Sequence, residues 1–108
     1  MKKAASAKIR FRLHRQGSEL VLAAADEDVL GKKHSGGGRV LDLAKYASFY
    51  GEQATDAVGL AKHLNACTSA NLAGKAAIGA ALSLGLAAPS DVVQIGSVSH
   101  LQLYKRLL

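Results

Sequence analysis

The sequence predicts an α+β domain in which a small, mainly antiparallel sheet packs on a helical hairpin. Residues 8–15 alternate apolar and basic side chains and lead through a short Gly-containing turn into a second apolar segment, the pattern of a β-hairpin. Residues 56–86 are rich in Ala and Leu at helical spacing, and residues 91–95 and 98–104 return to strand-like apolar segments. The predicted order is therefore ββ-β-αα-ββ.

The N-terminal half supplies three of the predicted strands. In residues 8–15 one face is expected to be buried and the other cationic, because Ile9, Phe11 and Leu13 alternate with Arg10, Arg12 and His14. Residues 19–25 are apolar on both faces, as in a strand that is covered on both sides. Asp26 is expected to cap a short helical turn. Residues 35–38 (Ser-Gly-Gly-Gly) are expected to form a mobile loop, and residues 39–43 the third strand.

The helical hairpin is predicted from residues 56–67 and 69–86, and the apolar side of the first helix is expected to be Val58, Leu60, Ala61 and Leu64. The second of these segments is the stretch around which the fold is expected to be organised, as one buried helix of about five turns. It is dominated by Ala and Gly and carries Lys75 as the charge in its body, which favours contact on more than one side. Gly85 is placed to adopt the left-handed cap, and Pro89 prevents the helix from continuing.

Charge is concentrated at the N-terminus of the chain. The 108 residues carry a formal net charge of +6, and the first fifteen contain six Lys and Arg side chains and no acidic one. We expect residues 1–7 to be a flexible basic arm and residues 8–108 to be a single globular domain. Such an excess is consistent with a polyanion-binding arm or with a solubilising tail, and composition alone does not separate the two.

The sequence lacks the residues that several classes of protein require. Cys67 is the single cysteine and the four histidines are scattered, so neither a metal site nor a cofactor is expected. His63 precedes Cys67 by four residues, yet a small buried cysteine explains that spacing more simply than a catalytic thiol does. No apolar run is long enough for a membrane span, and no signal peptide is recognisable. We expect a cytoplasmic protein, and the residues favour a non-enzymatic role over an enzymatic one.

Four segments carry a resemblance to a known family. They are residues 26–32 (DEDVLGK), 49–52 (FYGE), 68–75 (TSANLAGK) and 95–102 (IGSVSHLQ). In this order they resemble the archaeal family called Domain of Unknown Function 424. Ser99 stands where the family pattern has Pro, and residues 36–38 differ from its usual loop. The resemblance implies an archaeal, cytoplasmic origin and a fold, and the family has no assigned activity.

The basic side chains are the strongest functional signal. Arg10, Arg12 and His14 share one strand face at about 7 Å spacing, close to the distance between successive phosphates. The face has no interleaved aromatic residue, so contacts would fall on phosphates and not on bases. The predicted RNA-binding residues are Lys2, Lys3, Lys8, Arg10, Arg12, Arg15, Lys32, Lys33, Lys105 and Arg106.

A second group is polar and uncharged. Tyr50, Asn71, His100 and Gln102 all lie within the segments that carry the family resemblance. Asn71 is expected at the start of the second helix, where its side chain would cap free N–H groups. His100 and Gln102 project from the same strand face and, with Tyr50, form either a small binding pocket or a hydrogen-bonded structural network.

The sequence therefore favours a non-enzymatic RNA-associated protein that docks on ribosomal RNA or a ribonucleoprotein. A protein-interaction module built on the polar group is the alternative. A small enzyme acting on a nucleotide-like ligand is the third.

Overall fold

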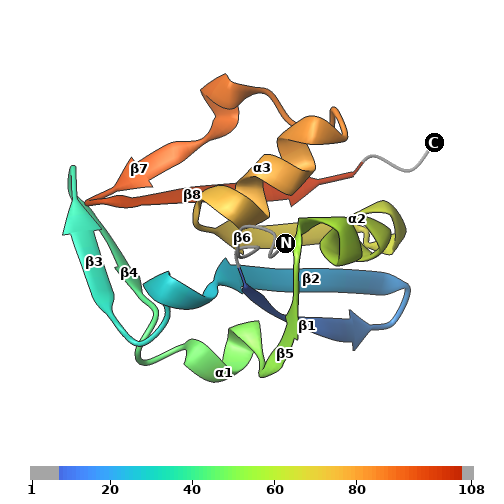
Figure 1. The fold of residues 1–108 in the computed structure, drawn as a ribbon, viewed down its shortest axis with the longest axis horizontal. Helices are drawn as coiled ribbons and strands as arrows, with labels where there is room; N and C mark the ends of the chain where they lie inside the picture. Colours follow the sequence, from blue (N-terminus) through green and yellow to red (C-terminus); the bar gives the residue numbers. More distant parts are fainter. Residues whose placement is uncertain (1–7, 106–108) are drawn as a thin grey trace, which may run out of the picture.

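A six-stranded sheet runs through the molecule in the order β5-β1-β2-β6-β8-β7 (Figure 1). The computed structural model describes residues 8–105. The β2–β6 pair is parallel and the other pairs are antiparallel. The strands are β1 (Ile9–Gln16), β2 (Glu19–Asp26), β5 (Gln53–Thr55), β6 (Ser69–Ala73), β7 (Val93–Ile95) and β8 (Val98–Tyr104). The predicted α+β class with a mainly antiparallel sheet is confirmed.

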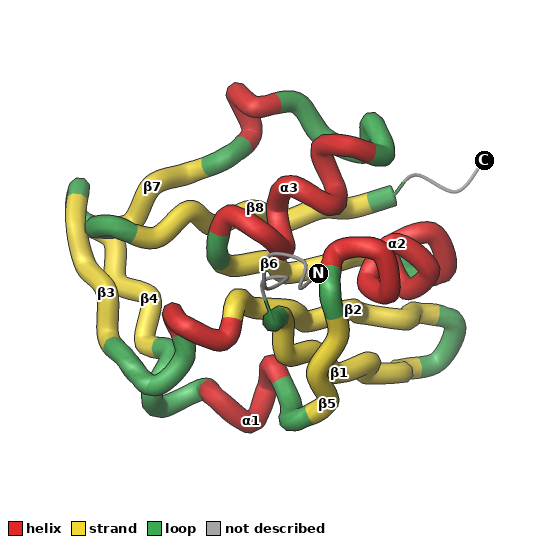
Figure 2. The backbone as a smooth tube through the Cα atoms, in the orientation of Figure 1, coloured by secondary structure: helices red, strands yellow, loops and turns green. Residues whose placement is uncertain are grey.

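The remaining elements cover the two faces of the sheet. Helices α2 (Ala57–Ala66) and α3 (Lys75–Ser83) pack on one face, and Figure 1 shows α3 crossing β6 and β8. The short helix α1 (Ala47–Tyr50) lies on the other. A separate two-stranded hairpin, β3 (Lys33–Gly36) and β4 (Arg39–Asp42), stands beside α1 at one end of the molecule (Figure 2). The 3₁₀ turns are η1 (Glu27–Val29) and η2 (Pro89–Asp91).

The first hairpin forms as its sequence predicts. Gln16 pairs with Glu19, and Gly17 takes a φ of +59° as the first residue of a two-residue turn. Ile9 and Phe11 are buried under the helices, while Arg10, Arg12 and His14 alternate with them and point to the opposite face. Strand β2 is buried on both faces, which explains why its sequence is continuously apolar.

The predicted long helix of residues 69–86 is wrong in its first third. Ser69–Ala73 is strand β6, inserted between β2 and β8, and only Lys75–Ser83 is helical. Gly74 separates them with φ +99° and ψ +157°, a backbone conformation that is essentially restricted to glycine. Consequently α2 and α3 do pack together, but a strand and not a turn connects them.

The end of α3 follows the predicted cap. Gly85 has a φ of +72°, its N–H donates to the Leu82 carbonyl, and the Leu86 N–H reaches back to the Ala81 carbonyl at 3.1 Å. This is a Schellman motif, which satisfies two of the carbonyls that the helix end leaves free.

Asp26 caps α3 and not the turn that follows it in sequence, which corrects the prediction. Its two carboxylate oxygens accept the Ala76 and Ala77 N–H groups, each at 2.9 Å, and η1 has no side-chain cap. Asp26 is 8% exposed, so this bond pair lies in the interior. The pKa of Asp26 is raised, because burial raises it more than the two backbone N–H bonds lower it.

Two other local predictions change. Residues 35–38 are not a mobile loop: Gly37 and Gly38, with φ of +60° and +79°, form the two-residue turn of the β3–β4 hairpin. Gly36 of this hairpin touches Gly96, where an added Cβ would come within 2.7 Å of the Gly96 nitrogen. On α2, Asp56 is the N-cap, and Val58 is 81% exposed where helical periodicity placed it in the core.

Two apolar clusters hold the sheet. The larger lies under α2 and α3, with Leu22, Leu60, Leu72 and Leu101 fully or almost fully buried. The smaller lies on the other face and joins β2 and β6 to α1 and the β3–β4 hairpin; its buried members are Ala23, Ala25, Leu43, Tyr50, Ala73 and Val98. This second cluster fixes the elements that surround the candidate site.

The junction between β6 and α3 is testable with two glycine substitutions. A Cβ added at Gly74 would lie 2.5 Å from Asp26 Oδ2 and 2.6 Å from Asp26 Cβ, at a φ that alanine disfavours. Gly74→Ala should therefore reduce the free energy of unfolding by about 2–4 kcal/mol, through strain and loss of the cap. Gly79→Ala is the matched control within α3, because a Cβ added at Gly79 would meet no atom within 4 Å.

Gly79→Ala should stabilise by about 0.5–1 kcal/mol, the ordinary gain of Ala over Gly in a helix. Urea unfolding followed by circular dichroism measures both variants. Equal effects of the two substitutions would contradict the described packing of Asp26 against Gly74.

Candidate functional site

Three of the four predicted polar residues meet on the sheet face opposite the helices. The Tyr50 hydroxyl donates to Asn71 Oδ1 at 2.7 Å, and His100 Nε2 lies 3.0 Å from the same oxygen. Asn71 lies in the middle of β6, so its predicted role as a helix cap is wrong. Gln102 is the register partner of Asn71 on β8, but it is exposed and does not join the network. The network joins α1 to β6 and β8.

Burial sets the protonation of this network. It raises the pKa of Tyr50 to about 12 and lowers the pKa of His100 below its usual value. At neutral pH Tyr50 is therefore a phenol that donates, and His100 is a neutral imidazole with its proton on Nε2. Asn71 Oδ1 accepts both bonds. The Asn71 Nδ2 group has no acceptor within residues 8–105, which leaves two N–H donors available.

A cleft of about 320 Å³ opens beside Asn71. Tyr50, Phe49 and Tyr46 contribute aromatic surface from α1 and its N-terminal cap. The complete lining is Leu41, Asp42, Leu43, Tyr46, Phe49, Tyr50 and Asn71. Tyr46 is 53% exposed, whereas Tyr50 is buried. We call this the aromatic cleft.

Charged side chains surround the aromatic cleft. Asp42 Oδ1 accepts the backbone N–H groups of Ala44 and Lys45, and its other oxygen has no hydrogen-bond donor within the described chain. Lys33 is the register partner of Asp42, so the two side chains leave the same face of the β3–β4 hairpin. The Lys45 ammonium lies 5.4 Å from the centre of the Tyr46 ring. Asp42 therefore supplies a carboxylate to the cleft lining, Lys45 lies beside the Tyr46 ring, and Lys33 shares a hairpin face with Asp42.

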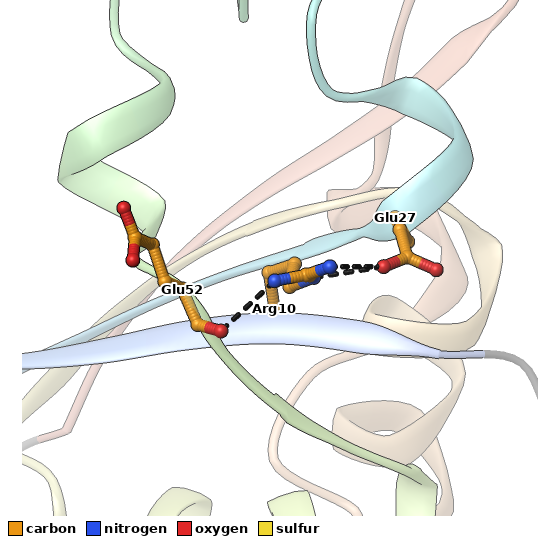
Figure 3. Close-up of polar contacts among 3 residues, drawn as sticks. All are labelled: Arg10, Glu27 and Glu52. Carbon is orange, nitrogen blue, oxygen red and sulfur yellow. Dashed lines mark hydrogen bonds and ion pairs between the residues drawn. The ribbon is translucent and has the colours of Figure 1, made fainter.

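The cationic face of β1 lies next to the cleft, but its residues are not equally free. Arg10 forms an ion pair with Glu27, with Nε 2.9 Å from the carboxylate, and donates to the Glu52 carbonyl (Figure 3). Arg12 is exposed and donates to the Ser48 carbonyl at 3.2 Å. The Arg10 side chain thus bridges elements of the fold, and Arg12 is the more accessible of the two.

His14 connects the same strand to the aromatic residues. Its ring stacks on Phe49 with 4.7 Å between centroids, and its Nε2 lies 2.8 Å from the Phe49 carbonyl oxygen. Phe49 in turn meets Tyr50 edge to face at 5.2 Å. β1 and the aromatic cleft therefore form one continuous surface.

The other predicted RNA-binding residues do not form a single patch. Arg15 and Lys105 lie at the same end of the sheet, linked across it by the backbone hydrogen bonds of Leu20 and Thr68. Lys33 lies at the opposite end, with the β3–β4 hairpin (Figure 1).

The remaining basic residues are similarly divided. Lys8 is exposed just before β1, and Lys32 is exposed just before β3. Lys2, Lys3 and Arg106 lie outside the described residues.

The metal-ligating side chains of residues 8–105 do not cluster, and Cys67 and His63 each have other partners. No group of three or more His, Cys, Asp or Glu side chains within residues 8–105 is arranged to hold a metal ion. Cys67 is buried, its thiol donates to the Leu64 carbonyl, and burial raises its pKa. His63 packs on Phe11 with 4.6 Å between ring centroids. Among the described helices, none has the length and apolar character needed to cross a bilayer.

Comparison with known proteins identifies the family. A family model described as "Protein of unknown function (DUF424)" matches residues 14–105. The chain belongs to the DUF424 family. No curated protein matches the sequence at a significant level. A similar solved structure is that of an uncharacterized conserved protein from Methanopyrus kandleri, with 26% identity and a TM-score of 0.77, covering 94% of this chain and 96% of that one.

The segments that suggested DUF424 from the sequence come together in the fold. The 26–32 segment supplies Asp26, the 49–52 segment supplies Tyr50, and the 68–75 segment supplies Asn71. The 95–102 segment adds His100. What the sequence missed is the other wall of the aromatic cleft, because that wall comes from β4 and from the cap of α1; its residues are Leu41, Asp42, Leu43 and Tyr46.

The lowered pKa of His100 predicts a pH-dependent stability. The unfolded chain binds a proton at His100 more readily than the folded protein does, so stability should fall as the pH drops below about 6.5, the ordinary value. His100→Gln is the reference variant, because its side-chain N–H can donate to Asn71 without titrating. Urea midpoints at pH 8 and pH 5 should show a larger loss for the wild type than for His100→Gln. An equal loss in both proteins would show that His100 is not buried in this network.

Proposed function

We propose that this protein is a non-enzymatic, RNA-associated protein that takes part in translation and docks on ribosomal RNA or a ribonucleoprotein. The basic N-terminal segment and β1 make the backbone contacts, and the helices α2 and α3 serve as the scaffold behind the sheet. An archaeal, cytoplasmic setting belongs to the same proposal.

The observation that carries this proposal is that few basic side chains are paired with an acidic side chain of the same protein. Within the described residues Arg10 is the one basic side chain with a carboxylate within 4.0 Å. The other Lys and Arg side chains of residues 8–105 therefore keep charge that an anionic partner can neutralise. The formal net charge of the whole chain is +6, and Lys2, Lys3 and Arg106, which lie outside the described residues, supply three of these charges.

The fold also directs part of that charge to one side. Arg12 leaves β1 on the face opposite α2 and α3, and Lys8 is exposed immediately before the start of β1. The same face bears α1 and the aromatic cleft. A nucleic acid lying along β1 would meet phosphate-binding side chains first, which gives affinity without sequence selection.

A protein-interaction module is the second candidate, and a different surface favours it. Val58 is 81% exposed and Leu84 is 38% exposed, and both line a groove of about 420 Å³ between α2 and α3. Sedimentation of cell lysate through a sucrose gradient separates the two candidates. Comigration with ribosomal particles that is lost on ribonuclease treatment supports RNA association, whereas a nuclease-resistant complex supports the protein partner.

Salt dependence tests the RNA contacts directly. If about five phosphates are neutralised, log K should fall against log salt with a slope near −3.5 for single strands and −4.5 for duplex. Lys8→Gln combined with Arg12→Gln should reduce the slope by about 1.4–1.8, and affinity should drop equally for unrelated sequences. Lys62→Gln with Lys75→Gln is the charge-matched control on the helical face and should leave the slope nearly unchanged.

Fluorescence anisotropy with labelled RNA at several salt concentrations supplies these slopes. Binding that does not change with salt, or identical slopes for the two double variants, would contradict the proposed contact surface.

A further inference from the structure

We propose that the aromatic cleft binds one unstacked nucleobase of a single-stranded RNA segment; this rests on the proposed RNA association and assigns it a second kind of contact. Phosphate contacts along β1 would hold the strand, and the cleft would hold a base.

The shape and lining of the aromatic cleft suit a flat ligand. Its volume of about 320 Å³ is at the lower end of the range for small-molecule sites. Leu41 of β4 lies on the apolar side of the lining with the fully buried Leu43 behind it, and Tyr46 supplies a ring that is 53% exposed. Unpaired bases in RNA complexes stack on such exposed aromatic rings.

The polar groups of the cleft complement the edge of a base. Asn71 Nδ2 offers N–H donors, because Oδ1 of the same amide is already occupied by Tyr50 and His100. Asp42 offers a carboxylate oxygen that no described group occupies. Each nucleobase presents a donor next to an acceptor on its Watson–Crick edge, so one amide and one carboxylate can satisfy it together.

The charge around the cleft favours a nucleotide over a cationic side chain. Aromatic rings beside a carboxylate could in principle hold an ammonium group. Here Lys45 already lies over Tyr46, and Lys33 stands opposite Asp42 in the hairpin. A further cation would be repelled by both lysines, whereas the phosphate attached to a base would be attracted.

The cleft and β1 are connected, so one strand of RNA can reach both. His14 of β1 stacks on Phe49, which lines the cleft, and Arg12 donates to the neighbouring Ser48 carbonyl. An RNA strand that runs from β1 to the aromatic cleft would therefore pass along α1.

The test compares two labelled single-stranded probes of six nucleotides, one a normal oligoribonucleotide and the other the same sugar-phosphate chain without bases. The normal probe should bind tighter. Tyr46→Leu should weaken the normal probe by roughly 5- to 150-fold, the range for loss of one stacked base, and should leave the base-free probe unaffected. Tyr46→Phe keeps the ring and should retain binding. Tyr104→Leu is the matched control, since Tyr104 is 75% exposed and does not line the cleft.

A spectroscopic measurement adds a direct readout. The two side-chain amide protons of Asn71 should shift in NMR spectra on addition of the normal probe and stay in place with the base-free one. Equal affinity of the two probes would overturn the proposal, and so would a mononucleotide that binds as tightly as the six-nucleotide probe. Binding of an acetyl-lysine peptide in the aromatic cleft, without any contribution of the bases to RNA binding, would also overturn the proposal. The ligand of the cleft would then be a peptide.

Failure of the base site can be distinguished from failure of RNA association. Tyr46 carries no charge, so Tyr46→Leu should not change the salt slope of the base-free probe. A normal slope with no effect of Tyr46→Leu would reject the base site alone, whereas a flat slope would reject RNA association itself.

Discussion

The buried Asp26 carboxylate ties the sheet to the helical layer, and the rest of the arrangement depends on that link. Its two oxygens hold the Ala76 and Ala77 N–H groups at the start of α3, where the helix dipole favours negative charge. The chain can make this approach only because Gly74 has no side chain to meet Asp26. The Gly74 N–H also donates to the Ser99 carbonyl, so the ends of β2, β6 and β8 meet at one point. Strand β6 is thereby held in the register that places Asn71 beside the cleft.

Local sequence was sufficient for the elements whose patterns have one interpretation. The alternation in β1, the apolar run of β2, and the Gly85 cap all appear in the structure as predicted. Residues 69–73 are different, because Ser-Ala-Asn-Leu-Ala fits both a helix and an alternating strand. Alanine favours a helix locally. However, residues 69–73 form a strand because pairing with β2 on one side and β8 on the other supplies a full set of backbone hydrogen bonds. The glycine at position 74 was the signal in the sequence that the strand ends there, because glycine readily takes the positive φ observed at this residue.

The candidate site was predicted in part for the same reason. Tyr50, Asn71 and His100 could be grouped because they lie in segments that resemble one family, although the local pattern did not decide between a helix and a strand at Asn71. The sequence predicts a strand at residues 39–43 but not its place in the wall of the cleft, because residues 35–38 suggest a loop until the turn geometry of the hairpin is known. The charge on Arg10 was visible in the sequence, but its pairing with Glu27 depends on how β1 and η1 are placed in space.

Hydrogen exchange at the start of α3 tests the Asp26 link most directly. The first N–H groups of a helix normally lack partners and exchange quickly, because helix ends fray. If Asp26 holds α3 to the sheet, the Ala76 and Ala77 amides should exchange only through global unfolding, as slowly as the Leu72 amide within β6. Fast exchange of both amides beside a protected Leu72 would show that the helix end opens independently of the sheet. The Asp26 link would then not be the constraint on which β6 and the cleft depend.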